Sequence, residues 1–283
     1  MTARRSVSQG ETELTVVQPP RGWASMGLAE IWQYRELLYF LAWRDLKIRY
    51  KQTFIGVAWA VLQPVLMMAI FTLFLGRLVN VSFAPLPYSV AALAGLLPWN
   101  FFVSGTTSAS DSVVSGQALV SRVYFPRLIL PAASMLSWFV DLLIGIILLF
   151  GMMAVFGIAP SWTVLLAPLF LILAYFTALG VGTWLSALNV AYRDVKYAVP
   201  FMMQLWMFAT PVVYPAVLVP ERFQWIYWLN PMAGVVEGFR WSMLGGPAPS
   251  SRLVLTSVGI TLALTVTGVA YFKNTERYFA DVI

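Results

Sequence analysis

The chain has 283 residues, of which 60% are hydrophobic and 11% charged, and it contains no histidine and no cysteine. No soluble domain of this length is built that way, so we expect a membrane protein. The missing cysteines exclude disulfides, zinc–thiolate sites and iron–sulfur clusters. The net charge of +6 does not indicate a nucleic-acid-binding protein, because the basic residues are dispersed among apolar segments instead of gathered on one soluble face.

The first 27 residues are polar and contain Pro19 and Pro20, which predicts a flexible cytoplasmic tail with little structure. They lack the apolar core of a cleavable signal peptide, so we expect the first membrane span to direct insertion.

Residues 28–51 are predicted to form an amphipathic interface helix, because apolar residues recur at spacings of three and four among charged ones. Its aromatic residues suit the lipid headgroup region, and its basic residues suit an anionic leaflet. Two interpretations stay open, a membrane-surface anchor and a contact surface for a cytoplasmic partner. The residues chosen to represent this helix are Trp32, Arg35, Trp43, Arg44 and Lys47.

Long apolar stretches predict an all-α polytopic membrane protein with six transmembrane helices, at roughly 20 apolar residues per crossing. The expected spans are 53–76, 88–110, 128–156, 162–188, 197–217 and 253–272. An even number of spans places both termini on one side. Fourteen of the 18 lysines and arginines then lie on that side, and the others are Arg77, Arg222, Arg240 and Arg252, so we expect cytoplasmic termini.

Residues 219–246 are predicted to form a re-entrant helix pair before the last span, because Pro231, Glu237 and Arg240 argue against a seventh crossing. Asn230 followed by Pro231 is the signature of a helix start. Glu237 and Arg240 are three residues apart and are expected to form an ion pair that neutralises the short helix, with a substrate contact as the second interpretation.

Asp141 lies thirteen residues into the predicted third span, which is near mid-membrane at roughly 1.5 Å per residue. A carboxylate at that depth is a candidate for a proton relay. No basic partner is evident in a neighbouring span, so we favour a structural hydrogen bond to another helix.

Residues 115–127, between the second and third spans, are short, basic and end in Phe125-Pro126-Arg127. Such a segment can be an ordinary linker, or an amphipathic turn that fits a groove of a partner and transmits its movement. The chain has no Gly-x-x-x-x-Gly-Lys-Ser/Thr phosphate loop and no set of catalytic residues, so we expect neither ATP hydrolysis by this chain nor any other catalytic site.

Several motifs occur in a specific order after residue 28. They are Asp45 to Lys51 with Gly56, Trp59 and Gln63-Pro64; Ser121 to Arg127 with Leu130-Pro131; Asn189 with Arg193-Asp194; and Leu229 to Gly234 with Glu237 to Arg240. In this order the chain resembles the type-2 ABC transporter permeases that export cell-surface polysaccharides such as O-antigen, capsule and teichoic acid.

The resemblance implies a homodimer that assembles with two copies of a separate cytoplasmic ATPase in the bacterial inner membrane. ATP and Mg²⁺ would be bound by that ATPase, with no cofactor in this chain, and the substrate would be a lipid-linked polysaccharide. It also assigns residues 115–127 to the coupling segment, and spans one and five to the channel wall. The candidate coupling residues are Leu119, Arg122, Tyr124, Phe125 and Arg127.

A passage for sugars needs aromatic faces and a few hydrogen-bonding groups. The candidates on spans one and five are Phe54, Trp59, Gln63, Phe201, Gln204, Trp206, Phe208 and Tyr214. Aromatic residues are also common on lipid-facing helices, so ordinary membrane packing stays open for each. Two other functions remain, a type-2 ABC permease for drugs or small lipids and an ATP-independent carrier or membrane transferase.

Overall fold

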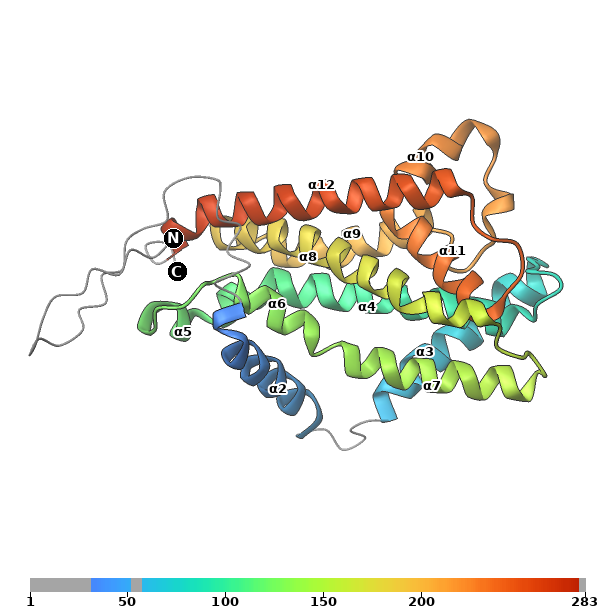
Figure 1. Cartoon of the computed structure of the whole chain (residues 1–283), viewed down its shortest axis with the longest axis horizontal. Helices are drawn as coiled ribbons and strands as arrows, with labels where there is room; N and C mark the ends of the chain where they lie inside the picture. Colours follow the sequence, from blue (N-terminus) through green and yellow to red (C-terminus); the bar gives the residue numbers. More distant parts are fainter. Residues whose placement is uncertain (1–31, 52–57, 280–283) are drawn as a thin grey trace, which may run out of the picture.

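The computed structural model describes residues 32–51 and 58–279. This part of the chain is helical and has no strand beyond one isolated bridge. The predicted tail, Phe54 and the first residues of the interface helix lie outside the described residues. Figure 1 shows a bundle of long helices with the short helix α2 (Arg35–Lys51) packed obliquely against one end.

Within residues 32–51 and 58–279, five helical segments are long and apolar enough to cross a membrane. They are Ala58–Leu78, Tyr88–Ser115, Ile129–Val155, Trp162–Ala191 and Ser251–Tyr278. The elements that make them up are α3 (Ala58–Phe71) with the π-helical turn Thr72–Leu78, α4 (Tyr88–Ser115), α6 (Ile129–Leu136) with α7 (Phe139–Val155), the 3-10 turn Trp162–Leu166 with α8 (Ala167–Ala191), and α12 (Ser251–Thr275) with Glu276–Tyr278. Five of the six predicted spans therefore recur, and most are longer than expected.

The predicted fifth span is too long. Helix α9 (Val195–Ala209) has only 15 residues, and Thr210 at its end is already extended. Pro211 follows, and proline disfavours helical geometry in the residue before it. About 22 Å of helix, at 1.5 Å per residue, is shorter than the apolar core of a bilayer. The segment 210–217 belongs to the loop that follows.

The predicted third span is broken. α6 ends at Leu136 and α7 begins at Phe139, although no proline or glycine lies between them. The side chain of Arg49 reaches this junction from α2: its Nη2 donates to Ser137 Oγ at 2.9 Å, and its guanidinium lies 3.3 Å from the centre of the Trp138 ring. The interruption thus coincides with a tertiary contact that no local sequence signal encodes.

Helix α4 is the centre of the bundle, and every residue from Val90 to Trp99 is buried. It packs against α8, α6, α11, α7, α3 and α9. At the end near the termini, a second apolar cluster joins α2, α4, α5, α6, α8 and α12 through residues such as Leu41, Phe125 and Phe272. This cluster positions the candidate site.

The predicted helix pair before the last span is present. α10 (Gln224–Leu229) is followed by α11 (Pro231–Leu244), which packs against α4, α8 and α12. Asn230 is the N-cap of α11 and accepts a hydrogen bond from the Met232 amide at 3.1 Å, as its position before Pro231 predicts. Gly245, at φ 74°, ends the helix.

Candidate functional site

The loop after α4 turns at Gly116 into the short helix α5 (Gln117–Arg122) and leaves it as extended chain at Val123. This helix has six residues, and Val120 is its buried residue. Arg122 and Tyr124 face outward, and the Tyr124 side chain is 73% exposed. This pair is the part of the predicted coupling segment that is open to a partner.

Phe125 and Arg127 both make contacts within the chain. Phe125 is 5% exposed and belongs to the second apolar cluster. Arg127 donates to the main-chain carbonyl of Glu276, and its guanidinium lies 6.0 Å from the Phe279 ring. Leu119 is partly buried against the same cluster. The burial of Phe125 contradicts the prediction that it contacts a partner, whereas Arg127 is only partly buried and stays a candidate contact.

The outward face of α2 is aromatic and basic. Trp32 and Trp43 are both exposed, and Lys47 lies 5.6 Å from the centre of the Trp43 ring. Arg35 lies 5.8 Å from the Trp32 ring. Side chains of this kind suit the headgroup region of a membrane, which agrees with the predicted interface position.

The C-terminal end of α2 contacts α7 through an ion pair. Arg49 Nη1 lies 2.5 Å from Asp141 Oδ2, and the Tyr50 hydroxyl donates to Asp141 Oδ1. Burial and the neighbouring Asp141 carboxylate raise the pKa of the Tyr50 phenol to about 12, so the phenol stays a donor at neutral pH. Asp141 is therefore hydrogen-bonded to another helix, as predicted, but its partner is a cation that sequence reasoning had not paired with it.

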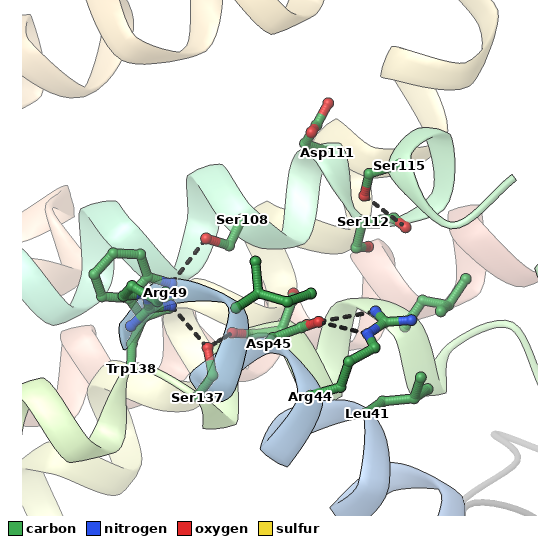
Figure 2. A pocket seen from close by; sticks show the side chains of 13 residues that line it. Leu41, Arg44, Asp45, Arg49, Ser108, Asp111, Ser112, Ser115, Ser137 and Trp138 are labelled. Atoms are coloured by element: carbon green, nitrogen blue, oxygen red, sulfur yellow. Dashed lines mark hydrogen bonds and ion pairs between the residues drawn. The ribbon is translucent and has the colours of Figure 1, made fainter. Parts of the chain in front are cut away.

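A cavity of 320 Å³ lies between α2, α4 and α6 beside this contact. Figure 2 shows Arg44, Asp45 and Arg49 reaching it from α2, with Ser108 and Ser112 on the facing side of α4. Arg44 donates twice to Asp45 Oδ1, at 2.8 Å and 3.0 Å. The cavity is thus lined by both signs of charge and by several hydroxyls.

The predicted channel residues divide into two groups. Trp206 Nε1 donates to Asn230 Oδ1 at 3.0 Å, and the Tyr214 hydroxyl donates to the Phe208 carbonyl at 2.9 Å, so both have structural partners within the chain. The other described candidates stand on the exposed faces of α3 and α9. They are Trp59, Gln63, Phe201, Gln204 and Phe208.

The predicted ion pair between Glu237 and Arg240 is wrong. Among the described residues the two side chains do not come within 4.0 Å. The Arg240 guanidinium is buried and donates to three main-chain carbonyls instead: Ala91 at 3.1 Å, Pro211 at 2.9 Å and Val212 at 2.6 Å. Ala91 belongs to α4, and Pro211 and Val212 belong to the loop after α9, so Arg240 fastens α11 to both.

The described residues contain no group of three or more histidine, cysteine, aspartate or glutamate side chains that could hold a metal ion. The Arg49–Asp141 contact is a charged contact that sequence reasoning missed. A signal existed, because an acid in an apolar stretch calls for a partner and Arg49 ends the preceding basic helix.

Known transport proteins are similar in sequence to most of this chain. The chain is 28% identical over 253 residues to an O-antigen export system permease protein RfbA of Klebsiella pneumoniae, covering 88% of this chain and 95% of the relative. It is 26% identical to RfbA of Myxococcus xanthus, covering 90% and 98%. It is 21% identical to the polysialic acid transport protein KpsM of Escherichia coli, covering 83% and 91%.

A family model described as ABC-2 type transporter matches residues 36–244. The match begins in α2 and ends with α11, so it contains the α2–α7 contact, α5 and the Arg240 anchor. Together with the apolar helices of the bundle, it identifies a transport subunit that resides in a membrane. The chain belongs to the ABC-2 type transporter family.

Proposed function

We propose that this chain is the permease subunit of an ABC exporter that moves a lipid-linked cell-surface polysaccharide across the bacterial inner membrane. The observation that carries the proposal is the match along nearly the full length of permeases named for O-antigen export. Relatives named for polysialic acid transport support the same substrate class. The motif order in the sequence favours this function over efflux of drugs or small lipids.

The energy source is proposed to be a separate ATPase, present in two copies, that binds ATP and Mg²⁺. The absence of a phosphate loop from the full sequence supports this division of labour. The proposed docking site is the end of the bundle that carries α5 and α2, where Arg122 and Tyr124 are exposed (Figure 1). The distribution of lysine and arginine supports placing this end and both termini in the cytoplasm.

Two copies of the chain are proposed to enclose the substrate path. Helix α3 buries only Pro64, and α9 buries only Val199 and Met203. Both helices pack on α4 and leave apolar and aromatic side chains exposed. Exposed apolar faces of this extent are typical of contact with lipid or with a second subunit. Trp59, Gln63, Phe201, Gln204 and Phe208 are the proposed wall of the passage.

The function is tested by deleting the gene for this chain in its bacterium and restoring it on a plasmid. We expect deletion to remove surface polysaccharide and to leave lipid-linked glycan on the cytoplasmic side, and restoration to reverse both. Surface labelling of intact cells and extraction of lipid-linked glycan measure the two pools. Unchanged surface glycan together with increased drug sensitivity would instead support the efflux function.

Docking of the ATPase is expected to depend on Tyr124. Tyr124→Ala removes an exposed aromatic side chain, and loss of such an anchor typically costs an interface about 2 kcal/mol or more. We expect weaker copurification of the ATPase at an unchanged unfolding temperature of the permease. Phe125→Ala should do the opposite and destabilise the permease by about 3 kcal/mol, because its side chain is buried.

The matched control for Tyr124 is Trp162→Ala. The Trp162 side chain is also 73% exposed, but it lies after α7, at the other end of the bundle (Figure 1). If Tyr124→Ala and Trp162→Ala retain equal amounts of ATPase, the loop after α5 is a linker.

A further inference from the structure

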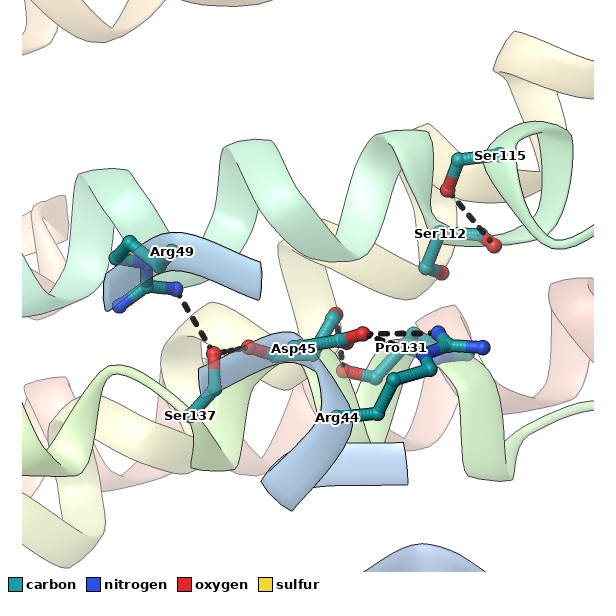
Figure 3. Close-up of polar contacts among 8 residues, drawn as sticks. Arg44, Asp45, Arg49, Ser112, Ser115, Pro131 and Ser137 are labelled. Carbon is teal, nitrogen blue, oxygen red and sulfur yellow. Dashed lines mark hydrogen bonds and ion pairs between the residues drawn. The ribbon is translucent and has the colours of Figure 1, made fainter. Parts of the chain in front are cut away.

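The cavity between α2, α4 and α6 has hydroxyl groups whose hydrogens are already used within the chain. Ser112 Oγ donates to the Ala109 carbonyl at 2.7 Å, and Ser134 Oγ donates to the Pro131 carbonyl at 3.0 Å. Ser115 Oγ donates to the Ser112 carbonyl at 3.3 Å (Figure 3). A hydroxyl that has donated its hydrogen still has lone pairs. These three serines therefore offer acceptors to a ligand.

Besides Arg49, three charged side chains of the described part of the chain line the cavity. They are Arg44, Asp45 and Asp111, and Asp111 lies 3.8 Å from Lys196. Arg44 uses Nε and Nη2 on Asp45 Oδ1. Asp45 Oδ2 and Arg44 Nη1 make no hydrogen bond to the described residues (Figure 3). A carboxylate oxygen accepts from a cation, and a guanidinium N–H donates to an anion. The cavity thus offers carboxylate oxygens to a cation and Arg44 Nη1 to an anion.

These groups disfavour the binding of a simple anion in the cavity. The two arginines that line the cavity are each paired with a carboxylate, since Arg44 lies 2.8 Å from Asp45 and Arg49 lies 2.5 Å from Asp141. An anion would meet Asp45 and a row of acceptor oxygens as well as Arg44. A ligand that carries a hydrogen-bonding cation and an anion a few atoms apart satisfies both groups.

The surroundings of the cavity indicate a membrane source for that ligand. Leu41, Ile48 and Leu130 provide an apolar part of its wall. The other face of α2 exposes Tyr39 and Trp43, whose rings stack with centroids 6.4 Å apart. Exposed aromatic rings on a helix beside membrane spans are typical of the headgroup level. The volume of 320 Å³ falls in the range of small-molecule sites, about 300–1,000 Å³.

We propose that this cavity binds the headgroup of a zwitterionic phospholipid with a primary ammonium group, of the phosphatidylethanolamine type. The ammonium donates to Asp45 Oδ2 and to the serine oxygens, and the phosphate accepts from Arg44 Nη1. The acyl chains leave along the apolar wall. A bound lipid would then join α2 to α4 and α6, beside the Arg49–Asp141 contact.

The test uses the purified full-length chain, with its ATPase where the two copurify, and native mass spectrometry of bound lipid. The probes are phosphatidylethanolamine, its mono- and dimethylated forms and phosphatidylcholine, all with the same acyl chains. The ammonium donors fall from three to none along this series while the net charge stays constant. We expect retention to fall at each step and to be roughly tenfold lower for phosphatidylcholine, the loss of a charge-assisted hydrogen bond.

Two variants separate this site from general lipid binding. Asp45→Asn removes the carboxylate that binds the ammonium and leaves Arg44 unpaired. We expect this variant to retain the four lipids of the methylation series equally and to bind phosphatidylglycerol more tightly than any of them. Asp194→Asn makes the same change at an exposed position and should leave the series intact. Ser112→Ala keeps the Arg44–Asp45 pair and removes one acceptor, so it should weaken the binding of phosphatidylethanolamine and leave the binding of phosphatidylcholine unchanged. This variant keeps the test valid if Asp45→Asn fails to fold.

Three results would overturn the proposal: equal retention across the methylation series, tighter binding of phosphatidylglycerol than of phosphatidylethanolamine by the native chain, or displacement of phosphatidylethanolamine by a lipid-free oligosaccharide. The last result would make the cavity a sugar site. Because binding is measured on purified protein, the outcome is independent of the proposed export function.

Discussion

Arg240→Ala is expected to lower the free energy of unfolding by about 3 kcal/mol or more, because each buried acceptor left without a donor costs about 1–3 kcal/mol. The guanidinium donates to the carbonyls of Ala91, Pro211 and Val212 from a buried position. Alanine removes the donor from the Pro211 and Val212 carbonyls and opens a void between α4, α11 and the loop after α9. Arg240→Lys should recover only part of the loss, because an ammonium cannot span the same three carbonyls.

Thermal unfolding in detergent, followed by size-exclusion chromatography, measures this effect. Arg222→Ala is the control, because Arg222 is exposed and lies against the ring of its neighbour Phe223. Gly95→Ala should resemble Arg240→Ala, since an added Cβ would lie 2.4 Å from Arg240 Nη2 and 2.3 Å from the Val212 carbonyl oxygen. Equal unfolding temperatures for Arg240→Ala and Arg222→Ala would show that the anchor contributes little.

Asp141→Leu is expected to abolish most polysaccharide export and to destabilise the permease by about 2 kcal/mol. Removing one partner of a buried ion pair costs more, but these side chains are 26% and 20% exposed, so solvent screens part of the effect. The variant removes the Asp141 carboxylate that accepts from Arg49 and Tyr50, and this contact between α2 and α7 is lost. Surface glycan at matched protein levels and the unfolding temperature are the two measurements.

The swap Arg49→Asp with Asp141→Arg should restore part of the export lost in Asp141→Leu, because it rebuilds an ion pair of opposite polarity. Lys196→Ala is the control. Lys196 lies 3.8 Å from Asp111 in a largely exposed pair, and such pairs contribute little to stability. Normal export by Asp141→Leu would mean that α2 does not need this contact to work.

The apolar helices could be predicted from the sequence because composition and length alone define them. The N-cap of α11 could also be predicted, since Asn230 followed by Pro231 is a local signal. The break at Ser137–Trp138 could not. No residue there disfavours helix strongly, and the arginine at the junction comes from a position 88 residues earlier.

Arg240 shows the same limit for side-chain partners. Spacing within a helix made Glu237 the expected partner, because residues three apart are neighbours on a helix surface. The actual partners lie 149, 29 and 28 residues away and are main-chain carbonyls, which carry no residue identity. Phe125 likewise looked like a surface anchor, because its burial depends on helices that follow much later in the chain.

The crossing of α8 and α12 has a mechanical consequence. A Cβ on Gly268 would lie 2.3 Å from the Gly180 carbonyl oxygen, and one on Gly180 would lie 2.6 Å from the Leu264 carbonyl carbon, so the two backbones touch. On the other side of α8, Gly182 leaves no room beside Ala109 of α4. Helices in such contact cannot slide or twist without separating, so α4, α8 and α12 form a rigid frame. The interruption at Ser137–Trp138, where Arg49 of α2 makes its contacts, lies outside this frame, so we expect a movement of α2 to bend the chain there before it displaces α4, α8 or α12.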